Sequence, residues 1–325
     1  MIPASTLRLR DLREGGRWGL AQSVKNGLVY AAIRAALALV GMVPPRLLRA
    51  LGERLGSLLW LAHRPWRAIA RSNVRRVMPD LDDTRSRALL AAAYRNLGGH
   101  LGDAVAALRP GAPASTLPFP AEAREVLSRA QGEGKGVLFV SAHLGPWERV
   151  AATLVANGFP LTTVARESYD PRLTSLYDRL RGARGVQSIY RGAPGAAFRM
   201  LRTLRRGGIL GMPMDLRSRV PSIGVPFLGA PAATPIGPAR LACRTGAAVV
   251  VATPAPGPAA HGRQGAMILT ATRIFLDDLA SGPEPEARLT ERINAELSRR
   301  ILALPEQWVW MHPRWEPINR IKLLP

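Results

Sequence analysis

A histidine and a glutamate form the clearest pair for proton-transfer chemistry in this sequence. His143 and Glu148 are separated by the four residues Leu144, Gly145, Pro146 and Trp147. A carboxylate bonded to one ring nitrogen of a histidine fixes the tautomer that lets the other nitrogen accept a proton near neutral pH. The spacing therefore predicts that Glu148 orients His143 as a general base. A satisfied polar pair with no catalytic role is the alternative, because paired titratable groups also occur in structural networks.

The elements around this pair are predicted to be a buried strand and a helix. Residues 137–140 are continuously apolar and rich in β-forming side chains, which is typical of a strand buried on both faces. Pro146 suits the first position of a helix, and the next apolar residues recur with helical spacing as far as Gly158. His143 is thus expected in the turn after the strand and Glu148 in the first helical turn, where free N–H groups could bind an oxyanion.

Strands and helices alternate along the rest of the central region. Further strands are predicted at residues 161–165, 185–190, 209–214, 247–252 and 267–274, and helical patterns separate several of them. This alternation favours an α/β fold with a mostly parallel central sheet flanked by helices.

Polar residues stand just beyond three of these strands, at His143, Arg166 and Asp215. Because the carboxyl ends of parallel strands share one edge of a sheet, the three side chains are expected to converge on one site. Arg166 could hold a phosphate through two hydrogen bonds with Arg217 assisting, and Asp215 could instead neutralise an arginine. A structural ion pair is the alternative for both Arg166 and Asp215.

The charge balance implies an anionic partner. Lys and Arg total 45 against 23 for Asp and Glu, which gives a formal net charge of +22. Aromatic residues make up 6% of the chain and no nucleic-acid-binding motif is evident, so a membrane surface or an acidic protein fits better than nucleic acid. A simply solvated basic face is the alternative. Cys243 is the sole cysteine, which excludes an intrachain disulfide and a cysteine zinc site, and it is expected to be a buried small hydrophobe.

The N-terminal region is predicted to contact a membrane. An apolar run at residues 27–43 follows four arginines, Arg8, Arg10, Arg13 and Arg17. After the run, leucines alternate with arginines over residues 46–60. The run contains Arg34 and is shorter than the roughly 20 apolar residues of a transmembrane helix. We therefore expect one or two amphipathic helices on, or shallowly in, the membrane surface, and packing of these helices onto the domain is the alternative.

The expected organisation is an N-terminal membrane-associating part, residues 1–65, followed by an α/β domain, residues 66–325. Within that domain, residues 66–120 form a helical lead-in and residues 121–325 the catalytic core. The lead-in contains a helix over 82–108, with Asp83 as its cap, and a Pro/Ala/Gly-rich linker over 111–120.

The stretch SAHLGPWE, residues 141–148, resembles the H-x4-D/E signature of the glycerolipid acyltransferases, and its flanks are most similar to the branch containing bacterial lipid A late acyltransferases. Further similar pieces follow in order over residues 27–318, at 73–79, Arg166, 214–217, 225–229, 235–242 and 305–312. The chain departs from the family at Pro146, where Asn is common, and at Leu216, where Gln is common. The second departure removes a polar group beside Asp215.

The resemblance implies transfer of an acyl chain from a thioester to a lipid hydroxyl, with no cofactor and no metal. It assigns catalysis to His143 and Glu148. The substrate-binding candidates are Arg166, Asp215, Arg217, Gly145, Trp147 and Phe227, and the Gly- and Pro-rich segment 216–234 is expected to be a long loop over an acyl-chain groove. It also implies acyl carrier protein as donor, a lipid A precursor or related anionic glycolipid as acceptor, and the cytoplasmic face of a bacterial inner membrane.

Other functions remain open at this point. The same chemistry could act on a glycerophospholipid, an ornithine lipid or another glycolipid, or could use a coenzyme A thioester. A non-catalytic membrane-binding protein could retain the fold. A hydrolase is disfavoured because the sequence has no G-x-S-x-G nucleophile elbow, and a metallohydrolase because it has no H-E-x-x-H pair.

Overall fold

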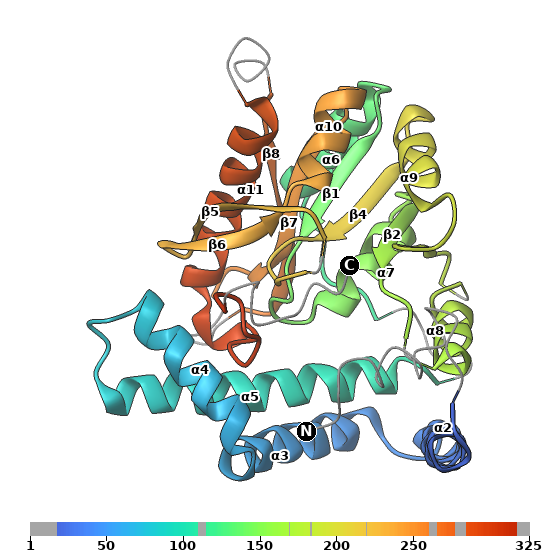
Figure 1. Ribbon diagram of the computed structural model, residues 1–325, viewed down its shortest axis with the longest axis vertical. Coiled ribbons are helices and arrows are strands. Elements are labelled where there is room, and N and C mark those ends of the chain that lie inside the picture. Colours follow the sequence, from blue (N-terminus) through green and yellow to red (C-terminus); the bar gives the residue numbers. More distant parts are fainter. Residues whose placement is uncertain are drawn as a thin grey trace.

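A six-stranded sheet forms the centre of the computed structural model, which describes residues 18–109, 115–168, 170–182, 184–218, 220–259, 265–276 and 284–316 (Figure 1). The strand order is β3-β2-β4-β1-β7-β8. The strands are β1 (Val137–Ser141), β2 (Leu161–Ala165), β3 (Gln187–Tyr190), β4 (Ile209–Pro213), β7 (Ala248–Pro256) and β8 (Met267–Ile274). All neighbouring pairs are parallel except β7 and β8. The predicted α/β fold with a mostly parallel sheet is therefore confirmed.

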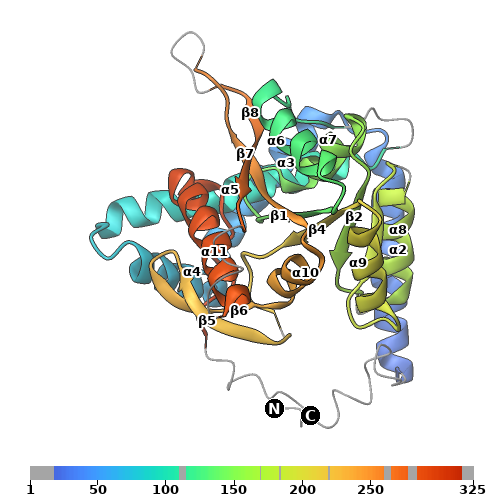
Figure 2. The same ribbon diagram turned by 90° about the horizontal axis from the view of Figure 1, so that it is seen from above.

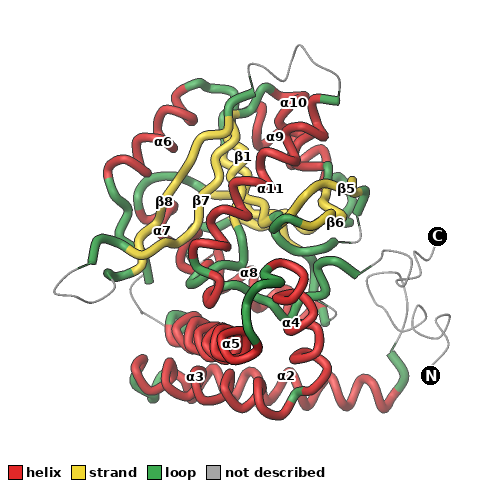
Figure 3. The backbone as a smooth tube through the Cα atoms, turned by 90° about the vertical axis from the view of Figure 1, so that its left-hand side faces the viewer, coloured by secondary structure: helices red, strands yellow, loops and turns green. Residues whose placement is uncertain are grey.

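Helices cover both faces of the sheet (Figure 3). One face carries α6 (Ala121–Gly132) and α7 (Trp147–Ala156), and the other carries α9 (Ala196–Arg205), α10 (Gly237–Thr245) and α11 (Pro285–Ala303). The side chains of β1 alternate between two cores: Phe139 packs in the core that contains Leu154 of α7, whereas Leu138 packs in the core that contains Leu297 of α11. A strand buried on both faces explains why residues 137–140 are apolar without a break.

The segment 216–234 folds differently from the long loop expected from its composition. It contains β5 (Ser222–Phe227), which pairs in antiparallel register with β6 (Ala230–Pro235). Leu228 and Gly229 turn the chain with positive φ values of 50° and 79°. The prediction of a structureless loop was wrong because a two-stranded sheet consists only of edges, where proline is tolerated.

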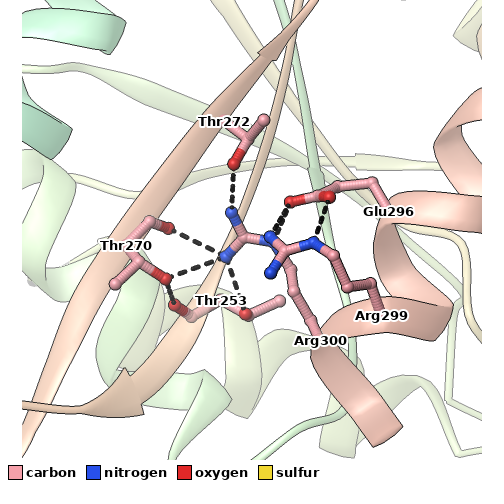
Figure 4. A network of polar contacts seen from close by, with 6 residues as sticks. All are labelled: Thr253, Thr270, Thr272, Glu296, Arg299 and Arg300. Atoms are coloured by element: carbon pink, nitrogen blue, oxygen red, sulfur yellow. Dashed lines mark hydrogen bonds and ion pairs between the residues drawn. The ribbon is translucent and has the colours of Figure 1, made fainter. Parts of the chain in front are cut away.

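A buried ionic network fastens α11 to the antiparallel edge of the sheet (Figure 4). The guanidinium of Arg300 donates to the carboxylate of Glu296 at 2.7 Å and to the hydroxyls of Thr253, Thr270 and Thr272 at 2.7–3.0 Å. Burial by itself would raise the pKa of Glu296, but hydrogen bonds from Arg299 and Arg300 lower it to about 2. The network is therefore an ion pair at neutral pH and holds helix and sheet together.

Two long helices lie below the sheet in Figure 1, and glycines bring them close together. In α3 (Pro45–Ala62), Gly52 faces Gly98 of α5 (Asp83–Ala106), and a Cβ atom on either glycine would overlap the backbone of the other helix. The opposite side of α3 carries leucines that are 48–67% exposed, at Leu47, Leu51, Leu55, Leu58 and Leu61. Thus α3 both packs onto the domain and presents an apolar face. The cap of α5 is Asp82, which accepts from the Arg85 N–H, and not Asp83 as predicted.

The N-terminal helix α2 (Leu20–Val40) is longer than the apolar run that predicts it. It has 21 residues, and 12% of its most apolar stretch is buried inside the protein. By length and composition alone α2 could cross a membrane, because the helix begins seven residues before the apolar run. It lies beside α8 (Pro171–Gly182) in Figure 2. The guanidinium carbon of Arg172 lies 4.9 Å from the centre of the Tyr30 ring. The arginines before Trp18 and residues 110–114 of the expected linker lie outside the described residues.

Candidate active site

His143 lies in the turn that joins β1 to α7. An isolated bridge pairs Leu144 with Trp308, and the Gly145 N–H donates to the Gln307 carbonyl at 2.9 Å. Gly145 has a φ of +56°, a left-handed conformation that glycine adopts at little cost. The turn is therefore braced by the chain around η2 (Pro305–Gln307), far away in the sequence.

Asp215 holds the imidazole of His143. Its Oδ1 lies 2.9 Å from His143 Nδ1, and its Oδ2 accepts from the His143 backbone N–H and from the Trp308 indole N–H, both at 2.9 Å. The sheet register explains the meeting, because Ser141 of β1 pairs with Pro213 of β4. Each partner therefore stands two residues beyond a paired position, at the shared carboxyl edge of adjacent strands.

The environment of the pair favours an ionised carboxylate and a more basic imidazole. Burial by itself lowers the pKa of His143, but the charge and hydrogen bond of Asp215, with a smaller contribution from the Glu148 charge, raise it above its ordinary value. Burial by itself raises the pKa of Asp215, but His143 and the Trp308 indole hold it below its ordinary value. The pair thus matches the pattern of a base with its orienting acid.

Glu148 does not orient His143, which corrects the prediction made from their spacing. The hydrogen bond at His143 Nδ1 is made by Asp215. The Glu148 carboxylate lies instead 4.0 Å from the guanidinium of Arg181. Glu148 stands in the first turn of α7 with its side chain 51% exposed. It acts on His143 through charge and not through a hydrogen bond.

A cavity of about 1090 Å³ opens in front of the pair. Its wall includes His143, Trp147, Glu148, Arg166 and Arg217, so the structure brings these predicted site residues together. The Trp147 ring meets the His143 ring edge-on, with centroids 5.5 Å apart. Because Asp215 takes Nδ1, the ring nitrogen that remains for a molecule in the cavity is Nε2.

Comparison with known proteins shows the family of the chain. Residues 22–316 match the family described as bacterial lipid A biosynthesis acyltransferase. The chain belongs to this acyltransferase family. It is also 27% identical over 199 residues to phosphatidylinositol mannoside acyltransferases from two strains of Mycobacterium tuberculosis, CDC 1551 / Oshkosh and ATCC 25618 / H37Rv. That match covers 58% of this chain and 57% of those relatives, so it spans a little over half of their length.

Three residues expected to bind substrate do not line the cavity of this family member. Asp215 is fully buried behind His143. Phe227 is also fully buried, with its ring 4.5 Å from the Arg314 guanidinium and 5.8 Å from the Trp308 ring, because it faces the core from β5. The Gly145 amide is already bonded to Gln307. The structure therefore does not support direct contact between a substrate and Asp215, Phe227 or Gly145.

Two other cavity residues were not among the predicted site residues. Arg191 follows β3 as Arg166 follows β2, and burial together with the charge of Arg166 lowers the pKa of Arg191. The position of Arg191 after a strand was the available signal. His312 also lines the cavity, and burial with the charges of Arg217 and Arg314 lowers its pKa to about 4 despite Asp215. His312 is thus neutral at physiological pH.

Trp308 combines a core position with a polar contact in the site. Its ring is buried, and its indole N–H donates to the carboxylate that orients His143. Within the described ranges, no three His, Cys, Asp or Glu side chains gather as a metal site requires. Cys243 is half-buried in α10, and burial raises the pKa of its thiol.

Proposed function

We propose that this protein transfers a fatty acyl chain from an acyl thioester to a hydroxyl of an anionic membrane glycolipid, with His143 as general base and Asp215 as its orienting acid. The observation that carries the proposal is the buried Asp215 carboxylate bonded to His143 Nδ1 while the ring lines the cavity. Family membership supports the acyl-transfer class.

The proposed reaction is a direct displacement. His143 Nε2 accepts the proton of the acceptor hydroxyl as that oxygen attacks the thioester carbonyl carbon. The charge of Asp215 stabilises the imidazolium that forms. Collapse of the tetrahedral intermediate breaks the C–S bond and releases a thiolate, which takes the proton from the imidazolium or from water. No metal or acyl-enzyme intermediate is needed in this scheme.

The cavity wall favours an anionic acceptor. Arg166, Arg191 and Arg217 stand around the cavity, and guanidinium groups suit phosphate recognition. A lipid A precursor fits the family description, and the mycobacterial relatives are named for an acceptor that is also a phosphorylated glycolipid. A glycerophospholipid or ornithine lipid acceptor is the alternative.

Acyl carrier protein is the proposed donor, and the cytoplasmic face of the inner membrane is the proposed location. The net charge of +22 favours both an acidic protein and an anionic surface. The exposed leucines of α3 and the apolar helix α2 would place the protein against the lipid.

The test is transfer of a labelled acyl chain from acyl carrier protein to a purified acceptor, with lipid A precursor, phosphatidylinositol mannoside and lysophospholipid compared. Wild type should acylate a phosphorylated glycolipid, and His143→Ala should lose about 10³-fold or more of that rate. The matched control is His63→Asn, which keeps a side-chain acceptor at the start of α4 (Arg64–Val77). Unchanged transfer by His143→Ala would remove the proposed mechanism, and transfer to the lysophospholipid alone would replace the acceptor.

A further inference from the structure

The surface made by α9 and α10 is rich in arginine and lacks acidic residues of its own. Residues 179–276 contain a single carboxylate, that of Asp215, and it is buried against His143. Residues 179–276 therefore carry a large excess of arginines over carboxylates. Such an imbalance over two adjacent helices favours an anionic partner.

Most of the arginines concerned are exposed and form no ion pair with a described carboxylate. They are Arg199, Arg202, Arg205 and Arg206 at α9 and Arg244 of α10, and we call them the α9–α10 basic face. Arg240 of α10, by contrast, pairs with Glu286 of α11 at 2.8 Å. Phe198 is 63% exposed on α9, so the face also offers an aromatic contact of the kind common at protein interfaces.

The basic face is continuous with the active-site cavity. Ala197 and Met200 of α9 line that cavity, and so do Leu241 and Arg244 of α10. The two helices contact each other, and both contribute residues to the wall of the cavity that His143 lines. A long acyl chain attached to a partner on this face could therefore reach the cavity.

The apolar helices lie at the opposite end of the molecule. Figures 1 and 3 show α9 and α10 beside the upper part of the sheet, whereas α3 lies below the sheet. The leucines of α3 point away from α5, toward the same lower side. With this lower side against a membrane, the α9–α10 basic face points toward water, and a soluble partner suits it better than a lipid surface.

We propose that the α9–α10 basic face is the docking surface for an acidic, soluble protein that presents the acyl thioester to the cavity. The inference rests on the proposed function, because acyl transfer requires a donor. It adds the place and the chemistry of donor recognition, namely carboxylates against the α9 arginines with Phe198 at the contact. Charge complementarity of this kind speeds association and selects partners, and salt weakens it.

The test compares Arg199→Glu/Arg202→Glu with the matched reversal Arg76→Glu/Arg87→Glu, at exposed arginines of α4 and α5. Binding of labelled acyl carrier protein is measured by fluorescence anisotropy in low salt. KM is measured for acyl carrier protein and for acyl-pantetheine, an uncharged thioester with the same acyl chain. We expect the α9 reversal to raise both Kd and KM for the protein donor about tenfold or more. The control reversal should change them less than twofold, and KM for acyl-pantetheine should not change.

Each outcome separates docking from chemistry. Equal binding by wild type and the α9 variant would overturn the docking surface, as would equal losses with both thioesters. If the wild-type protein does not bind acyl carrier protein but still transfers the acyl chain of acyl-pantetheine, the docking proposal is overturned and acyl transfer is supported. Arginine-dependent binding without turnover of any thioester would support docking and contradict the proposed function. A parallel loss of binding to phosphatidylglycerol vesicles would assign the face to the membrane instead.

Discussion

Two buried ionic clusters in this protein, one around Arg300 and one formed by His143 and Asp215, differ in whether a polar atom remains accessible from outside. Arg300 is 7% exposed, and each of its guanidinium nitrogens has an acceptor in Glu296 or in the threonines of β7 and β8. In the other group the carboxylate of Asp215 is equally well bonded, but the side chain of His143 remains 28% exposed and lines the cavity. The closed network can only stabilise the fold, whereas the open pair keeps one ring nitrogen for chemistry.

The comparison shows that burial and pairing alone do not mark a catalytic group. Both networks contain a carboxylate whose pKa is held below its ordinary value despite burial. They differ in their cations, because an arginine stays charged at any working pH, whereas a histidine can give and take a proton. Access to a cavity and a titratable partner together distinguish the second group.

The largest expected effect comes from Asp215→Asn. The carboxylate of Asp215 accepts from three donors, the His143 backbone N–H, His143 Nδ1–H and the Trp308 indole N–H. The NH₂ group of an asparagine cannot accept a hydrogen bond, so at least one of these bonds would be lost and the imidazole would lose its orientation. We expect kcat/KM for acyl transfer to fall about 10³-fold. Steady-state kinetics measure the effect on activity, and a thermal melt measures the effect on stability. Activity within tenfold of wild type would show that Asp215 is structural, like Glu296.

Arg300→Met should act on stability and leave the chemistry intact. Removing the cation leaves the Glu296 carboxylate and the threonine hydroxyls without their buried donor, which costs about 3 kcal/mol of unfolding free energy. Urea unfolding followed by circular dichroism measures this loss. Arg299→Met is the control, because its side chain is 65% exposed, and it should cost less than about 1 kcal/mol. A large drop in kcat at a temperature where Arg300→Met is folded would contradict the division of roles.

Glu148→Gln should have a smaller effect than Asp215→Asn. Glu148 acts on His143 through its charge, and its side chain makes no hydrogen bond to the imidazole. We expect a loss of about tenfold in kcat/KM, with KM and kcat measured for the same donor and acceptor. Glu122→Gln on α6 is an exposed control. A loss as large as that of Asp215→Asn would restore Glu148 to a direct role at the reacting atoms.

The smallest expected effect is a shift of the pH profile. A general base works when it is deprotonated, so kcat/KM should fall as the pH drops through the raised pKa of His143, which lies above 6.5. In Asp215→Asn and in Glu148→Gln this limb should move to lower pH, because each variant removes a negative charge that raises the pKa. Profiles of kcat/KM between pH 5 and 9 measure the shift. An acid limb at the same pH in all three proteins would assign it to another group.

The same pKa shift affects stability with the opposite sense. The raised pKa of His143 means that its protonated form stabilises the folded state below its ordinary pKa, and this contribution is lost as the pH rises through the folded value. Activity and this part of stability therefore have opposite pH dependences.

Local patterns sufficed for most of the fold. The predicted strands match β1, β2, β3, β4, β7 and β8 within a few residues. The signal is strongest for β1, β4 and β7, because a strand buried on both faces needs a continuous apolar run. The hairpin of β5 and β6 was missed because glycine and proline obscure strand patterns, and its stability depends on α11. Asn294 of that helix donates to the Pro226 carbonyl and to the Thr234 hydroxyl, both at 2.9 Å.

The sequence by itself indicated the class of protein and the edge of the sheet where the candidate site lies. It placed His143 in the turn after a buried strand and put Arg166 and Asp215 after two others, and it indicated the acyltransferase family. Only the tertiary structure decided which carboxylate holds the imidazole. Glu148 is near His143 along the chain, but Asp215 reaches Nδ1 because β4 lies beside β1 in a register that aligns the two strand ends. Strand order and register arise from packing between distant segments, which spacing along the chain does not encode.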